Sequence, residues 1–81
     1  MDDAQIEKVS IGTWVKVTGF VPGEEEVFHL VREAEADVAE NRIPPSSPLA
    51  RALTGAKVGE TVPLRTPGAL VELTVLEAGK R

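Results

Sequence analysis

The side chains in this sequence that are best suited to chemistry are carboxylates. Glu24, Glu25 and Glu26 form a run of three, and a second acidic group lies in residues 33–40. Oxygen ligands of this kind can hold Mg²⁺ or Ca²⁺. The alternating Asp/Asn pattern with a central Gly that marks a calcium loop is absent, so a solvated acidic surface is the favoured interpretation. The members of the second group are Glu33, Glu35, Asp37 and Glu40.

Other kinds of catalytic chemistry have less support. His29 is the single histidine, and the sequence places no hydroxyl and carboxylate in a recognisable catalytic relation to it. One histidine without any cysteine also leaves too few ligands for most zinc sites. Trp14, Phe20 and Phe28 are too few aromatic residues for the deep apolar pocket of a prolyl isomerase. The sequence therefore predicts a binding module, not an enzyme, with no cofactor and no metal.

Length and composition are typical of one small domain. The chain has 81 residues, of which 42% are hydrophobic, and a net charge of −4. Its nine Lys and Arg residues are scattered, so we expect no basic surface for nucleic acid. No apolar run is as long as a membrane span, and the first residues lack the order of a signal peptide. We expect a cytoplasmic protein that contacts no membrane, and the oligomeric state stays open.

Most of the chain has the pattern of β-strands. Residues 12–20 alternate, with Val15 and Val17 on one face and Trp14 on the other, where an exposed indole would mark a contact patch. A Pro-Gly turn leads to a second strand, which predicts an antiparallel hairpin. Pro63 places its strand at a sheet edge. The predicted strands are residues 12–20, 26–33, 42–43, 61–65 and 69–77, with a loop at 34–41 and turns at 21–24 and 66–68.

One short helix is marked at both ends. Ser47 is a good N-cap, and Pro48 falls at the first helical position, where its missing N–H costs nothing. Gly55 can adopt the left-handed conformation that ends a helix. Leu49 and Leu53 share one face. These elements predict an α+β domain over residues 12–81, preceded by a flexible lead-in at 1–11: a twisted antiparallel sheet with the helix packed across a face.

Several short motifs together resemble the C-terminal domain of the bacterial transcript cleavage factors GreA and GreB. The resemblance covers about residues 12–78, and it depends on the order and spacing of the motifs rather than on any one of them. The motifs are Ala34-Glu35-Ala36-Asp37, Ile43, the run from Ser46 to Leu53, Val58-Gly59-Glu60, Thr66-Pro67-Gly68 and the run from Val71 to Leu76.

This resemblance implies an FKBP-like fold without isomerase activity, and a role in transcription elongation. Domains of this family dock on RNA polymerase at the rim of the secondary channel, against the coiled coil of the β′ subunit. The family's contact region includes the segment that leads into the helix. Carried over by position, it comprises Ser46, Ser47, Pro48, Leu49 and Arg51, although capping alone also explains Ser47 and Pro48.

The sequence departs from the family pattern in two places. The family's N-terminal coiled coil, whose acidic tip helps to hold the catalytic Mg²⁺ of the polymerase, has no counterpart in these residues, and Asp2 and Asp3 cannot replace it. We therefore expect docking without stimulation of transcript cleavage. Pro44 and Pro45 replace strand-like residues before the helix, which predicts a stiffer approach to it.

Two alternatives to polymerase docking stay open. The fold can be reused as a general protein-interaction domain with another partner. The group of Glu35, Asp37 and Glu40 can also belong to a metal binder or an enzyme.

Overall fold

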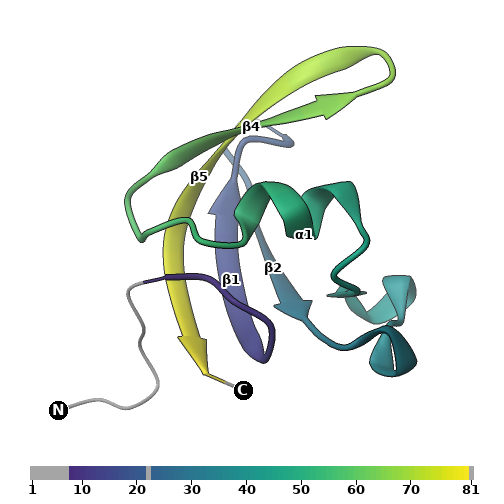
Figure 1. Cartoon of the computed structure of the whole chain (residues 1–81). Coiled ribbons are helices and arrows are strands. Elements are labelled where there is room, and N and C mark those ends of the chain that lie inside the picture. The colour runs from purple at the N-terminus through teal and green to yellow at the C-terminus, as the bar shows by residue number, and fades with distance from the viewer. Residues whose placement is uncertain (1–7, 22, 81) are drawn as a thin grey trace, which may run out of the picture.

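The computed structural model describes residues 8–21 and 23–80. They form one five-stranded sheet in the order β3-β2-β1-β5-β4, with a single α-helix, α1, lying across one face (Figure 1). The α+β architecture predicted from the sequence is confirmed. The strands are β1 (Thr13–Thr18), β2 (Glu25–Leu30), β3 (Arg42–Ile43), β4 (Thr61–Thr66) and β5 (Ala69–Lys80); α1 is Pro48–Leu53, and two 3-10 turns are η1 (Glu33–Glu35) and η2 (Val38–Glu40).

The sheet is mixed, so the prediction of a purely antiparallel sheet is wrong at one edge. β1 pairs antiparallel with β2 and β5, and β4 pairs antiparallel with β5, but β3 runs parallel to β2. The cause is the connection over residues 31–41. It contains both 3-10 turns and carries the chain back along β2, whereas a tight hairpin would have reversed it.

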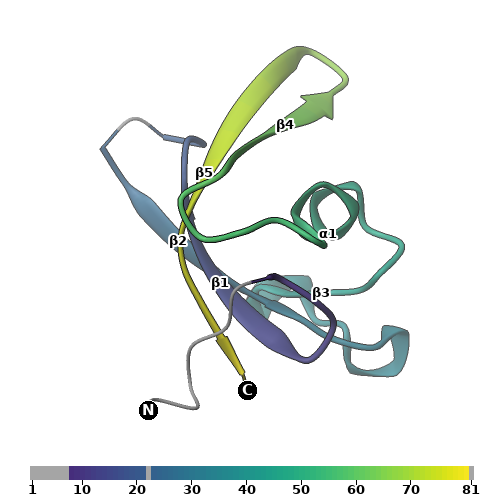
Figure 2. The same ribbon diagram turned by 60° about the vertical axis from the view of Figure 1, so that its left-hand side comes forward.

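β5 is longer than the sequence predicted, and it bends. Its first half pairs with β4 and its second half with β1. The register against β1 shifts between Lys16 and Val17, which face Glu77 and Val75, so Leu76 is the extra residue of a β-bulge. A bulge breaks the alternation of inward and outward side chains. The alternating pattern in the sequence therefore stops near the bulge, and the predicted strand ends before β5 does. The bend helps to curl the sheet around α1 (Figure 2).

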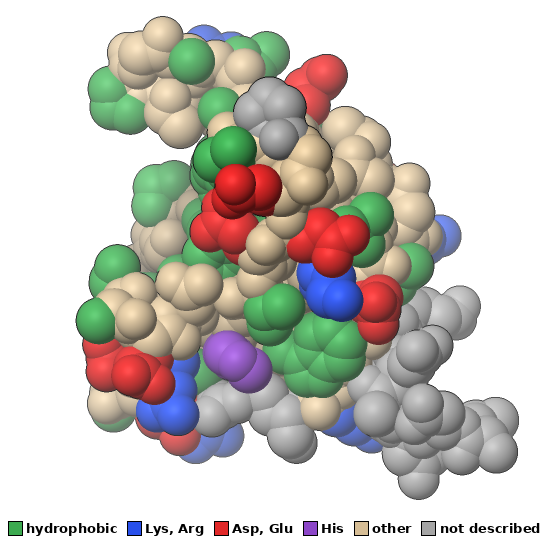
Figure 3. Space-filling model, turned by 180° about the vertical axis from the view of Figure 1, so that it is seen from behind, with side chains coloured by type: hydrophobic (Ala, Val, Ile, Leu, Met, Phe, Trp, Pro, Cys, Tyr) green, Lys and Arg blue, Asp and Glu red, His purple; other side chains and the backbone are tan. Residues whose placement is uncertain are grey.

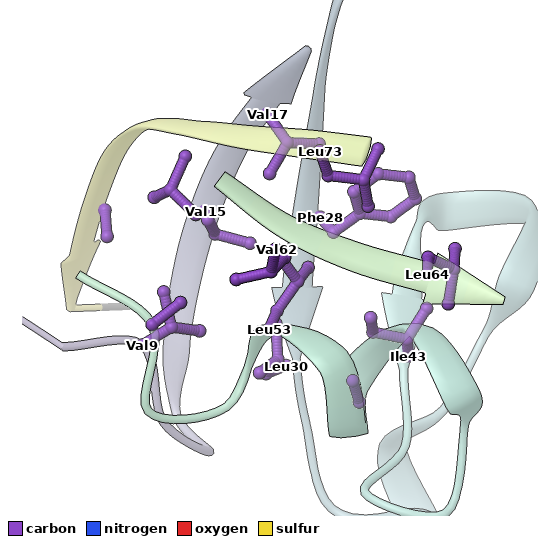
Figure 4. Close-up of a cluster of buried hydrophobic side chains, with 14 residues drawn as sticks. Val9, Val15, Val17, Phe28, Leu30, Ile43, Leu53, Val62, Leu64 and Leu73 are labelled. Atoms are coloured by element: carbon purple, nitrogen blue, oxygen red, sulfur yellow. The ribbon is translucent and has the colours of Figure 1, made fainter. Parts of the chain in front are cut away.

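The hydrophobic core lies between the concave face of the sheet and α1. Val15, Val17 and Leu30 are fully buried on the sheet side, and Ala50 and Leu53 are fully buried on the helix. Figure 4 shows these groups converging from the two layers. The predicted inward face of β1 is therefore confirmed, whereas on α1 Leu53 is buried as predicted but Leu49 is only half-buried and Ala50 takes its place in the core. Burying a side chain of this size stabilises the domain by about 1.5–3 kcal/mol.

The start of the domain differs from the predicted flexible lead-in. Residues 1–7 lie outside the described residues, but residues 8–11 are held by the fold. Val9 is 1% exposed and belongs to the core, and Gly12 N–H donates to the carbonyl oxygen of Leu30 at 2.8 Å. Because the residues around Val9 in the sequence are mostly polar, its burial in the core could not be predicted from the sequence. In the described part of the chain, no helix has the length and apolar character needed to cross a membrane.

Candidate protein-docking site

The start of α1 is fixed by the two residues that the sequence singled out. The backbone of Ser47 is extended, and its Oγ accepts a hydrogen bond from Leu49 N–H at 3.2 Å. Pro48 occupies the first helical position. Since a helix leaves its first N–H groups unpaired, this hydroxyl and this ring together explain why the helix begins here.

The end of α1 is built differently from a simple glycine cap. Thr54 is the C-cap, and its N–H and its Oγ1 both donate to the carbonyl oxygen of Ala50, at 2.9 and 2.6 Å. Gly55 has a φ of +87°, the left-handed conformation that the sequence predicted. Its N–H, however, turns away from the helix and donates to the carbonyl oxygen of Val9 at 2.7 Å. The helix terminus is thus tied to the beginning of the domain.

The approach to α1 is a short proline turn between a buried residue and the helix. Ile43 is 6% exposed and anchors the end of β3 in the core. Two residues later the chain turns, and Ser47 N–H donates to the carbonyl oxygen of Pro44 at 3.0 Å. Pro45 is exposed. Because proline fixes its own φ, a stiff approach to the helix stays a prediction from Pro44 and Pro45.

The five residues carried over from the resemblance run from the turn before α1 to its last turn, and we call them the docking segment: Ser46, Ser47, Pro48, Leu49 and Arg51. Ser46, Pro48 and Arg51 are exposed, while Ser47 and Leu49 are half-buried. Leu49 packs against the core from its edge. Within the described ranges Arg51 forms no ion pair. The segment therefore presents a proline ring, the hydroxyl of Ser46 and a guanidinium at the surface.

The acidic side chains do not form a metal site in the part of the chain that the structure describes. Over residues 8–21 and 23–80, no three Asp, Glu or His side chains come close enough to hold an ion. Asp37 instead caps η2, where its carboxylate accepts from Ala39 N–H at 3.2 Å. Glu25 and Glu77 flank Lys16 on the sheet, at 3.9 and 3.2 Å from its Nζ. These contacts support the interpretation of the acids as surface and capping groups.

The outer face of the sheet carries Trp14 and His29, which are opposite each other in register. Figure 3 shows the histidine, in purple, next to hydrophobic side chains. Trp14 is half-buried, so it is not the freely exposed indole that would mark a contact patch. Its other neighbour in register is Gly79, which is buried. An aromatic ring beside a strand glycine commonly shields the bare backbone. Trp14 thus has a structural role on this face.

Comparisons with known proteins agree with this arrangement. The family described as "Transcription elongation factor, GreA/GreB, C-term" matches residues 4–80. The transcription elongation factor GreA of Caldanaerobacter subterraneus subsp. tengcongensis is 41% identical over 76 residues, which are 94% of this chain and 48% of that protein. The chain spans about half the length of the curated relatives it matches.

Two solved structures share the fold. The GreA factor homolog Gfh1 of Thermus thermophilus superimposes with a TM-score of 0.75 at 29% identity, covering 96% of this chain and 52% of that one. Gfh1 of Thermus aquaticus gives a TM-score of 0.77 at 33% identity, covering 88% and 47%. The curled sheet and its single capped helix thus define a small α+β domain of the Gre type. The chain belongs to the GreA/GreB family of transcription elongation factors, and it corresponds to their C-terminal domain.

Proposed function

We propose that this chain binds bacterial RNA polymerase at the rim of the secondary channel, against the coiled coil of the β′ subunit, and that it acts in the cytoplasm. The observation that carries the proposal is the docking segment itself. The residues that the family resemblance assigns to polymerase contact lie along the turn before α1 and on α1 itself, in a chain that belongs to the family. Exposed, rigidly held polar and proline groups are well suited to specific contact because little conformational freedom is lost on binding.

The local geometry supports a division of roles within the segment. The hydroxyl of Ser47 is already engaged in the helix cap, so Ser47 contributes to binding mainly by fixing the shape of the segment. Pro48 is exposed although it also starts the helix, and the exposed guanidinium of Arg51 forms no ion pair within the described residues. We therefore assign the direct contacts to Pro48 and Arg51, with Leu49 supplying an apolar edge that continues into the core.

We propose that these 81 residues bind polymerase but do not take part in transcript cleavage. The family's cleavage activity is attributed to the acidic tip of a coiled coil, and the described part of this domain gathers no group of acids that could hold an ion. We expect the domain to bind polymerase without stimulating transcript cleavage by itself. It would then occupy the site that full-length relatives use, and compete with them.

The test is a binding measurement on the chain and two proline variants. Pro48→Ala should weaken binding to core polymerase more than it weakens folding. Pro67→Ala is the matched control, because Pro67 is also exposed but lies in the turn after β4. Equal losses of binding and stability in Pro48→Ala would mean that Pro48 only starts the helix. Capture of a different protein in preference to polymerase would favour the general interaction domain.

A further inference from the structure

Two backbone hydrogen bonds join the beginning of the domain to the end of α1, in an antiparallel pairing of the two segments. Val9 N–H donates to the carbonyl oxygen of Ala56 at 2.9 Å, and the carbonyl oxygen of Val9 accepts from Gly55 N–H at 2.7 Å. Lys8 forms an antiparallel bridge with Lys57. We call Lys8–Val9 the strap. It pairs like a strand with the segment that leaves the helix, although it lies outside the named strands.

The side chain of Val9 reinforces this backbone pairing. Val9 is 1% exposed and Ala56 is 4% exposed, so the pairing is shielded from water. Both residues belong to the same core as Leu53, the last residue of α1. Figure 4 places Val9 beside the connection that follows the helix. Pulling the strap away would therefore expose apolar surface and two backbone hydrogen bonds together.

The conformation of Gly55 depends on this contact as well. Its φ of +87° points its N–H at Val9, and a Cβ at this position would meet no atom within 4 Å. Glycine is therefore favoured at this position by the positive φ of the backbone and not by a lack of space for a side chain. On its other side the same connection is held by β5, where Gly59 N–H donates to the carbonyl oxygen of Val75 at 2.7 Å. The strap is one of two supports for the exit of α1.

We infer that the strap is a positioning device that fixes the exit of α1 and, through it, the placement of the docking helix. Loosening of the contact between Val9 and Gly55 should therefore loosen α1. This inference rests on the proposed function for its consequence, which is altered docking on polymerase. The coupling itself is a property of the free domain. By linkage, a partner that holds α1 must also stabilise the strap.

The first arm of the test uses the free chain and amide hydrogen exchange. Val9→Ala should speed exchange at Arg51 and Thr54 about tenfold more than it speeds exchange in β1 and β2. Val17→Ala is the matched control, since it removes the same two methyl groups from a fully buried site in β1. Equal acceleration throughout the domain in both variants would reduce Val9 to an ordinary core residue and overturn the inference.

The second arm adds core polymerase as the probe. In the wild-type chain, polymerase should slow exchange at the amides of Val9 and Gly55 as well as in the docking segment. Protection confined to the docking segment would contradict the coupling while leaving the docking proposal intact. If wild-type chain does not bind polymerase, the proposed function fails, and the first arm still decides on the strap.

Discussion

At the scale of single residues, the docking segment combines side chains that the fold uses with side chains that it does not. The hydroxyl of Ser47 is engaged in capping α1, whereas the guanidinium of Arg51 is exposed and forms no ion pair within residues 8–21 and 23–80. The two kinds of residue should therefore respond differently to substitution. Substitution of Ser47 should change the stability of the domain, and substitution of Arg51 should change its binding to polymerase.

For Ser47, we predict a loss of stability. Ser47→Ala removes the acceptor for Leu49 N–H and should lower the free energy of unfolding by about 1 kcal/mol. Ser47→Asp is the control, because its carboxylate can accept the same bond and should retain most of the stability. Urea denaturation followed by Trp14 fluorescence measures both. Equal stability of Ser47→Ala and wild type would show that the cap contributes nothing.

For Arg51, we predict a loss of binding with little change in folding. Arg51→Glu should change the free energy of unfolding by no more than about 0.5 kcal/mol, since the side chain is on the surface. Its affinity for polymerase should fall, and that of Arg65→Glu, which reverses another exposed charge on β4, should not. A similar loss of affinity in both variants would assign the effect to net charge alone.

At the scale of elements, the decisive contacts are those where two backbones approach closely. Gly19 follows β1 with a φ of +135°, and a Cβ placed on it would collide with the backbone carbonyl oxygen of Glu72 in β5. Gly12 also has a positive φ, +93°, but a Cβ there would meet no atom within 4 Å. Substitution of Gly12 therefore causes conformational strain alone, whereas substitution of Gly19 causes both strain and a steric collision.

We predict that Gly19→Ala is much more harmful than Gly12→Ala. The first should lower the free energy of unfolding by about 3 kcal/mol, because strain and collision add, and the second by about 1 kcal/mol from strain alone. Thermal unfolding by circular dichroism compares them. Comparable losses would mean that β5 moves aside easily at Glu72.

The elements also show which signals a sequence carries. The helix could be predicted nearly to the residue because Ser47, Pro48 and Gly55 act locally. The strap could not, because a lone buried valine between polar residues has no period. The parallel pairing of β3 and the bulge at Leu76 were missed for a related reason: both depend on contacts between segments far apart in the chain. Of the candidate site, the residues could be named from resemblance, but their exposure came only from the structure.

At the scale of the whole molecule, the domain is a curled sheet whose edge strands are β3 and β4; β3 has only two residues and Arg42 is bridged to Asp37, so β4, with six residues, is the longer open edge. Pro63 lies in the middle of that edge strand and offers no N–H to a neighbouring chain. We predict that Pro63→Thr leaves the fold intact but raises self-association, measured by sedimentation velocity across a concentration series. Pro67→Ala, in the turn after β4, is the control and should stay unchanged. A variant as monodisperse as wild type would show that the edge is protected by other means.

The central claim is that the start of α1 docks this domain on RNA polymerase. Its most direct test is an equilibrium titration of the fluorescently labelled chain with two core polymerases, one intact and one lacking the tip of the β′ coiled coil. We predict saturable binding to the intact enzyme, weakened by Pro48→Ala, and loss of binding when the tip is removed. Absence of binding to the intact enzyme at concentrations on the order of tens of micromolar, or equal binding to both enzymes, would contradict the claim.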